Sequence, residues 1–285
     1  MSLRSQEIAF DIGGAQLAAK RWSNGPRRVI ALHGWLDNAA SFDRLAPLLE
    51  ADIVALDLAG HGHSYHRTLQ ASYNIWDDLP DILRVANALE WPHFHLLGHS
   101  RGAIISGLLT AATPQRVASV VMLDGLIPET RPAPEFFDQL AMHLKQHLAP
   151  PGRIAHYASF GEALQARCLV SGMDADGARP IVVRGLAHDA QGWWWRSDRR
   201  LRLASAMRLS DEHVDVMIRQ VVATPHLLLM AERAIKGSEQ RREQIRDVTG
   251  LHWQMAAGGH HFHLENDVAT TAEKINAFWK EVPGG

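Results

Sequence analysis

Short apolar runs alternate with amphipathic segments along the first half of the chain. The apolar runs are typical of buried β-strands, and the segments between them have helical spacing. This alternation predicts an α/β fold, with a mostly parallel central sheet flanked by helices. The expected strands are Val29–Leu32, Ile53–Leu56, Phe94–Leu97, Val117–Leu123 and His226–Met230, with Leu251–Met255 as a weaker candidate.

Two further patterns complete the expected core. Glu7–Phe10 and Gln16–Arg21 lie on either side of a Gly13-Gly14 turn, and they predict an antiparallel hairpin. Ser41 and Thr270 could cap the first turns of their helices. The expected helices are Ser41–Leu49, Trp76–Leu89, Gly102–Ala112, Glu239–Val248 and Thr270–Lys280.

The pattern changes between Asp124 and Thr224. Pro, Arg, His and Trp become frequent there, strand-like runs become few, and several helical patches remain. Pro225 then restarts the strand pattern. We therefore expect a helical cap at 126–223, inserted before the last two strands and folded over one end of the sheet. The core domain would then comprise 1–125 and 224–285.

Composition narrows the class of protein. The 285 residues, 46% of them hydrophobic, suffice for one core domain with a large insertion. A net charge of -2 gives no basic surplus for nucleic acid. Cys168 is the single cysteine, so no internal disulfide can form. The first residues lack the apolar core of a signal peptide. No stretch approaches the roughly 18 apolar residues of a membrane span. We expect a soluble cytoplasmic protein, and the sequence predicts no particular oligomeric state.

The segment Gly98-His99-Ser100-Arg101-Gly102 lies between a predicted strand and a predicted helix. Glycines two positions before and after Ser100 allow a sharp, strained turn that lifts the hydroxyl clear of the sheet. The N–H groups at the helix start would face developing negative charge. Ser100 is therefore the candidate nucleophile. The alternative is a glycine-bounded turn with a capping serine.

The first parallel strand leads into His33-Gly34-Trp35. Gly34 lets the backbone approach a substrate closely, so we expect the N–H groups of Trp35 and Arg101 to form an oxyanion hole. We interpret His33 as structural, because its ring can bond nearby backbone. The Trp35 ring could equally pack against the next helix.

The histidine-rich segment GGHHFHLEN follows the last predicted strand and can reach the elbow. His260 follows two glycines that would let its ring turn inward, which makes it the preferred base over His261. Asp124 ends an apolar strand at the same edge of the sheet and is the preferred acid, with Glu232 as the alternative. A surface cluster of histidines and a loop-capping carboxylate are the simpler interpretations.

With these residues the chain resembles the α/β-hydrolase superfamily. More narrowly it resembles the serine hydrolase-like branch, close in pattern to epoxide hydrolases and haloalkane dehalogenases. The matching stretches, in the expected order, are LHGWLDNAASFDRLAPLL, DLAGHGHS, LLGHSRG, VVMLDG and GGHHFHLEN. The usual family aspartate in a run like GERD corresponds to Ala234 here, which favours Asp124 as the acid. Relatives that open epoxides or release halide carry an aspartate nucleophile, so Ser100 argues against both reactions.

Two other features bear on the site. Three histidine pairs have a spacing that could suggest a metal: His61/His63, His93/His95 and His261/His263. Two of these pairs lie in or beside segments already explained, and the third starts a strand. We therefore expect neither metal nor cofactor. Trp193, Trp194 and Trp195 are candidates to line the pocket, where aromatic rings would favour an apolar acyl or aryl group. Packing of the cap onto the core is the alternative for these three rings.

The predicted reaction is acyl transfer to water by a carboxylesterase-like enzyme. Ser100 would attack a small or medium carboxylic ester, thioester or lactone of apolar character, with His260 and Asp124 completing the triad. Two alternatives stay open. The same triad could serve carbon–carbon bond hydrolysis or a lyase reaction, or the chain could be a ligand-binding protein with little turnover.

Overall fold

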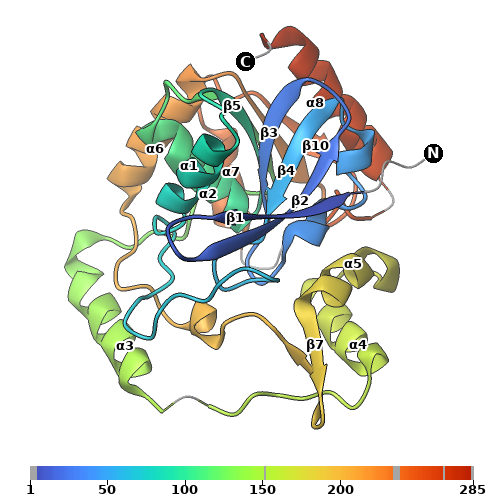
Figure 1. Cartoon of the computed structure of the whole chain (residues 1–285). Helices are drawn as coiled ribbons and strands as arrows, with labels where there is room; N and C mark the ends of the chain where they lie inside the picture. The colour runs from blue at the N-terminus through green and yellow to red at the C-terminus, as the bar shows by residue number, and fades with distance from the viewer. Residues whose placement is uncertain (1–4, 151, 234–237, 266, 284–285) are drawn as a thin grey trace.

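The computed structural model describes residues 5–150, 152–233, 238–265 and 267–283. Its centre is an eight-stranded sheet in the order β1-β2-β4-β3-β5-β6-β9-β10 (Figure 1). The six strands from β4 to β10 in that order pair in parallel, while β1 and β2 form an antiparallel edge. The expected strands and hairpin are confirmed as β1 (Gln6–Asp11), β2 (Gln16–Ser23), β3 (Arg27–Leu32), β4 (Ala51–Leu56), β5 (Phe94–His99), β6 (Val117–Leu123), β9 (His226–Ala231) and β10 (Trp253–Ala256).

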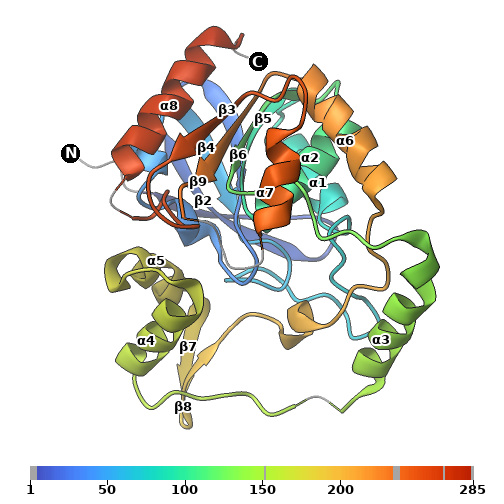
Figure 2. The ribbon, with the colours of Figure 1, turned by 180° about the vertical axis from the view of Figure 1, so that it is seen from behind.

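Helices cover both faces of this sheet (Figures 1 and 2). One face packs against α1 (Leu79–Ala88), α2 (Arg101–Ala112), α6 (Asp211–Ala223) and α7 (Glu239–Arg246), and the other against α8 (Val268–Glu281). Because successive strand residues point to opposite faces, Leu96 and Leu97 of β5 belong to different apolar clusters. Within the described ranges, no helix is long and apolar enough to cross a membrane.

Some local expectations were wrong. The segment expected to be a helix at Ser41–Leu49 forms two 3₁₀ turns, η1 (Ala39–Phe42) and η2 (Ala46–Leu48), because Pro47 has no N–H to continue a helical ladder. Ser41 is not a cap; the Asn38 side chain accepts the N–H of Ala40 instead. The last helix starts at Val268, after Asp267, so Thr270 is inside it.

The segment between β6 and β9 is mostly helical, as expected. It contains η3 (Ala133–Glu135), α3 (Phe136–Leu148), α4 (Phe160–Ser171), α5 (Ala175–Gly185) and η4 (Arg199–Arg202). It also contains an unexpected antiparallel hairpin, β7 (Leu186–Asp189) and β8 (Gly192–Trp195), which turns at a glycine with φ 123°. Figure 2 shows α4, α5 and this hairpin beneath one end of the sheet.

The helix α6 lies within the expected cap but packs like a core helix. It contacts α2, and Val214, Met217 and Val221 are buried in the same apolar cluster as the sheet. Its amphipathic sequence gave no sign of which surface it would cover. We propose that the cap ends before α6, and that α6 belongs with the core.

Candidate active site

Ser100 occupies the turn between β5 and α2. Its backbone has φ 50° and ψ −115°, a strained conformation for a residue with a side chain. The Ser100 N–H donates to the Leu123 carbonyl of the neighbouring strand at 2.9 Å. A Cβ atom at Gly98 would lie 2.5 Å from the backbone of α2, and one at Gly102 would lie 2.0 Å from the Leu32 carbonyl oxygen. Both glycines are therefore required for this tight turn.

Asp124, at the end of β6, faces His260 in the loop after β10. The Nδ1 atom of His260 lies 2.7 Å from Oδ2 of Asp124. The other carboxylate oxygen accepts the Ala231 N–H at 2.9 Å and lies 3.4 Å from Arg242. Burial raises the pKa of Asp124, but the hydrogen bonds from His260 and Ala231 more than offset this and hold it below its usual value. An ionised Asp124 keeps the proton on Nδ1, so that Nε2 can accept one.

Glu232, the alternative acid, lies elsewhere. It is exposed just beyond β9, and its backbone N–H donates to the Ala256 carbonyl at 2.9 Å. Within the described residues its side chain forms no ion pair with His260, so the structure brings Asp124 to that ring instead. Ala234 falls outside the described residues.

Ser100, Asp124 and His260 line one pocket of about 230 Å³. This pocket lies between α2, the loop after β6 and α7. Its apolar side chains can contact a hydrocarbon group of modest size, and charged residues such as Glu129 and Arg241 also line it. The apolar residues that line it are Ile104, Leu126, Ile127, Pro128, Met230 and Ile245.

The three adjacent tryptophans do not line this pocket. The ring of Trp193 lies 5.7 Å from that of Phe160, and Trp195 donates its indole N–H to the Tyr157 hydroxyl at 3.4 Å. Trp194 is half-buried on the same strand. Trp193 and Trp195 therefore pack against the apolar cluster of the cap, which also includes Leu264 of the core, and not against this pocket.

The loop from His33 to Trp35 lies beside the elbow. A Cβ atom at Gly34 would lie 2.9 Å from Nδ1 of His99, so only glycine fits there. Both ring nitrogens of His33 bond backbone: Nδ1 donates to the Gly34 carbonyl at 2.7 Å, and Nε2 accepts the Leu58 N–H at 3.0 Å. Burial lowers the pKa of His33, which keeps its ring neutral.

The two N–H groups expected to bind an oxyanion have no acceptor among the described residues, and of the two residues only Arg101 lines the pocket of Ser100. Arg101 is the first residue of α2, where an N–H has no acceptor within the helix. The Trp35 N–H likewise has no acceptor in the described part of the chain. Their side chains are held elsewhere: Arg101 forms an ion pair with Asp78 at 2.9 Å, and the Trp35 indole, 50% exposed, donates to the Leu201 carbonyl at 3.0 Å.

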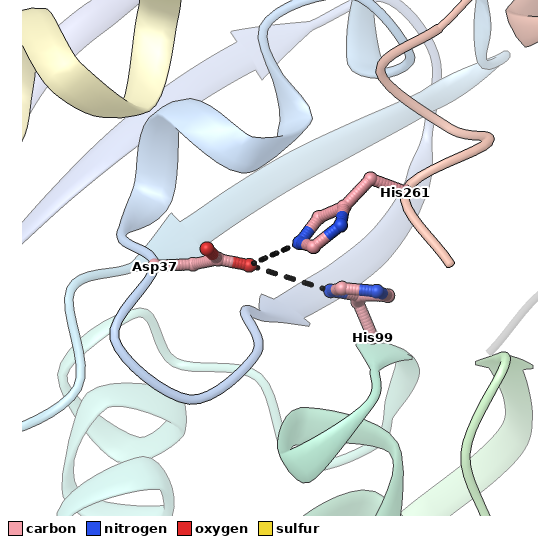
Figure 3. A group of neighbouring side chains, drawn as sticks. All are labelled: Asp37, His99 and His261. Carbon is pink, nitrogen blue, oxygen red and sulfur yellow. Dashed lines mark hydrogen bonds and ion pairs between the residues drawn. The ribbon is translucent and has the colours of Figure 1, made fainter. Parts of the chain in front are cut away.

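A buried cluster next to these residues was missed from the sequence. Oδ2 of Asp37 lies 3.3 Å from Nε2 of His261 and 3.5 Å from Nδ1 of His99 (Figure 3). Arg167 of α4 donates to the other Asp37 oxygen. One ligand atom from each of Asp37, His99 and His261 lies within 4.8 Å of the others, so among the described residues this group could hold a metal ion. Position in the chain was the one sign that could have revealed this cluster, because His99 and His261 are adjacent to Ser100 and His260.

Comparisons with known proteins identify the family and the fold. Residues 27–171 match the family model described as the alpha/beta hydrolase fold. The crystal structure of a hypothetical protein of Pseudomonas aeruginosa is 40% identical, with a TM-score of 0.90 over 97% of this chain and 98% of that one. A serine hydrolase-like protein of Dictyostelium discoideum is 28% identical over 97% of this chain and 82% of its own length. A probable serine hydrolase of Drosophila melanogaster is 29% identical over 91% of this chain and 83% of its own.

Proposed function

The chain belongs to the α/β-hydrolase fold family, and we propose that it is a serine hydrolase with Ser100 as nucleophile, His260 as base and Asp124 as the supporting acid. One observation carries the proposal. The His260 Nδ1 atom lies 2.7 Å from the Asp124 carboxylate, in a pocket that Ser100 also lines. These residues are distant in sequence and meet only through the fold.

The reaction is acyl transfer to water. The Ser100 hydroxyl attacks the carbonyl carbon and passes its proton to Nε2 of His260, while ionised Asp124 stabilises the imidazolium. The N–H groups of Trp35 and Arg101 donate to the oxyanion of the tetrahedral intermediate. His260 then protonates the leaving alcohol or thiol, which leaves an acyl-enzyme on Ser100. A water molecule, deprotonated by His260, releases the carboxylic acid and restores the enzyme.

The proposed substrate is a carboxylic ester, thioester or lactone with a small or medium acyl group. The pocket volume of about 230 Å³ is below the 300–1,000 Å³ that is typical of sites for drug-sized ligands. The apolar residues of its lining favour a hydrocarbon acyl chain, and Arg101, Arg241 and Arg242 also line it. A carboxylesterase-like activity is the specific form of the proposal.

Fluorophosphonate labelling tests the nucleophile, and a series of p-nitrophenyl esters from acetate to octanoate tests the substrate. We expect the native protein and a Ser171→Ala control to label rapidly, and Ser100→Ala to remain unlabelled. We also expect kcat/KM to be highest for short chains and to fall once the acyl group exceeds the pocket. A native protein that fails to label would favour a ligand-binding role. Rapid labelling with poor turnover of every ester would favour carbon–carbon bond cleavage.

A further inference from the structure

Asp37 contacts the chain neighbours of both proposed catalytic residues. Its Oδ2 atom lies 3.3 Å from the ring of His261, which directly follows His260. The same oxygen lies 3.5 Å from the ring of His99, which directly precedes Ser100 (Figure 3). One buried carboxylate therefore lies against the side chains of two residues, each adjacent in the chain to a proposed catalytic residue.

His99 also links the strand that ends before Ser100 to the loop that carries His260. Its Nε2 atom lies 3.0 Å from the carbonyl oxygen of His260 and donates to it. Burial lowers the pKa of His99 to about 3, so the ring is neutral and its Nδ1 atom has no proton to donate to Asp37. The His99 side chain is wholly buried, so water cannot replace its bond to His260. The bond ties the last residue of β5 directly to the backbone of the proposed base.

The cap supplies the charge that balances Asp37. Arg167 of α4 donates to Oδ1, and the two side chains are 10% and 1% exposed. Burial raises the pKa of Asp37, but Arg167 and His261 more than offset this and hold it well below its usual value. Removal of one partner from a buried ion pair leaves the other charge uncompensated, so this pair depends strongly on the docked position of α4.

We propose that Asp37 is a positioning residue for the hydrolytic reaction, and that Arg167 makes its action depend on the docked cap. The proposal rests on the proposed function, because it requires Ser100 and His260 to act as nucleophile and base. Asp37 touches no substrate. It acts through His261, which it holds beside the proposed base, while His99 ties the elbow strand to the same loop through the His260 carbonyl.

A metal site is the main competing interpretation of this cluster. Asp37, His99 and His261 offer the oxygen and nitrogen atoms that zinc prefers, at suitable spacing. However, the Asp37 carboxylate already has Arg167 as its counter-ion, and a divalent cation would lie close to that guanidinium. Charge balance therefore favours positioning, and the experiment includes metal binding as an opposing result.

The rate of fluorophosphonate labelling reports directly on the reactivity of Ser100. We expect Arg167→Ala and Asp37→Asn each to lower this rate and kcat by about 10- to 100-fold, as for a small misplacement of reacting groups. KM for a short ester should change little, and Arg167→Lys should recover part of the rate. Arg179→Ala is the matched control, since that arginine is exposed on the neighbouring cap helix and should label like the native protein.

A destabilised cap separates positioning from a merely structural role. Leu164→Ala creates a cavity in the apolar cluster of the cap and should lower the melting temperature without slowing labelling well below that temperature. The double variant Asp37→Asn/Arg167→Ala should label about as slowly as either single variant, because the two act as one unit.

Four results would overturn the inference. Native-like labelling of Arg167→Ala would reject the positioning role and leave the proposed function standing. No labelling of the native protein would reject the proposed function and the positioning role together. Equal loss of labelling in Leu164→Ala would assign a structural role. Loss of labelling after EDTA treatment, restored by Zn²⁺, would identify a metal site instead.

Discussion

The core and the cap differ in the contacts that stabilise them. The sheet lies between two large apolar clusters, and strand residues such as Leu96 and Leu97 are wholly buried. The cap has one smaller cluster, formed around Leu164 and Ile181, to which the core contributes Leu264. The core therefore has a hydrophobic interior of its own, while the cap meets it over a limited apolar area.

Buried charge connects the cap to the core instead. Arg184 of α5 donates to both Asp57 oxygens, at 2.9 and 3.0 Å, and to Glu7 at 2.8 Å. Arg167 of α4 reaches Asp37. Apolar burial is non-directional and spread over many residues, whereas a buried ion pair depends on two residues and their geometry. Cap docking should consequently be sensitive to single substitutions and to pH, and the core should be less so.

The largest expected effect concerns chemistry carried by the core. His260→Ala should lower kcat by about a million-fold, the size found when the base of a serine triad is removed. The variant should still fold, with a modest loss of thermal stability, because Asp124 loses one partner but keeps the Ala231 N–H and Arg242. Steady-state kinetics and calorimetry measure the two quantities. A greater loss of kcat in His261→Ala would move the base to that residue.

Asp124→Asn should have the next largest effect, at about 10⁴-fold in kcat. The amide cannot stabilise the imidazolium, and it can hold the ring in the wrong tautomer. Glu232→Gln is the matched control and should keep nearly native kcat, because this side chain is exposed and away from His260. The opposite ranking would make Glu232 the acid.

The core could be predicted from sequence because its signals are local. The apolar run of β5, the glycines around Ser100 and the helical spacing of α2 are continuous in the chain. Parallel strands end at one edge of a sheet, and this rule alone predicted that Asp124 and the loop of His260 would lie near the elbow. The failure at Ser41–Leu49 was also local, since Pro47 interrupts an otherwise helical pattern.

The cap could be predicted only in outline. Its helical character follows from spacing, but the hairpin β7–β8 was hidden in a tryptophan-rich stretch, and α6 has the same amphipathic pattern as a cap helix. The contact between Arg167 and Asp37 joins residues 130 positions apart. Such a pair depends on how α4 docks, and neither periodicity nor a motif encodes that orientation.

Arg184→Ala tests whether the cap depends on single ion pairs. The substitution leaves Asp57 buried without its counter-ion, which should destabilise the docked state by about 3–5 kcal/mol. Leu97→Ala, a cavity in the core, should cost a similar amount, about 2–5 kcal/mol, but across the whole core. Limited proteolysis under native conditions should therefore cut the cap of Arg184→Ala first. Equal protection of the cap in the two variants would contradict the comparison.

Acid should weaken the cap before the core, and this is the smallest effect that we expect. Burial raises the pKa of Asp37 and of Asp198, but Arg167 and Arg200 respectively help to hold both below the usual value. The pKa of such a carboxylate is lower in the folded protein than in the unfolded chain, where it is near 3.9. The ionised group therefore stabilises the fold above the unfolded pKa. This contribution is lost as the pH falls through the folded pKa. Hydrogen exchange, corrected for intrinsic rates, should show that α4 loses protection as the pH falls from about 5 to about 2, while β5 keeps it. Asp37→Asn cannot titrate at this position, so its α4 protection should depend less on pH. If native α4 and β5 lost protection together, the two regions would not differ in the way that their contacts indicate.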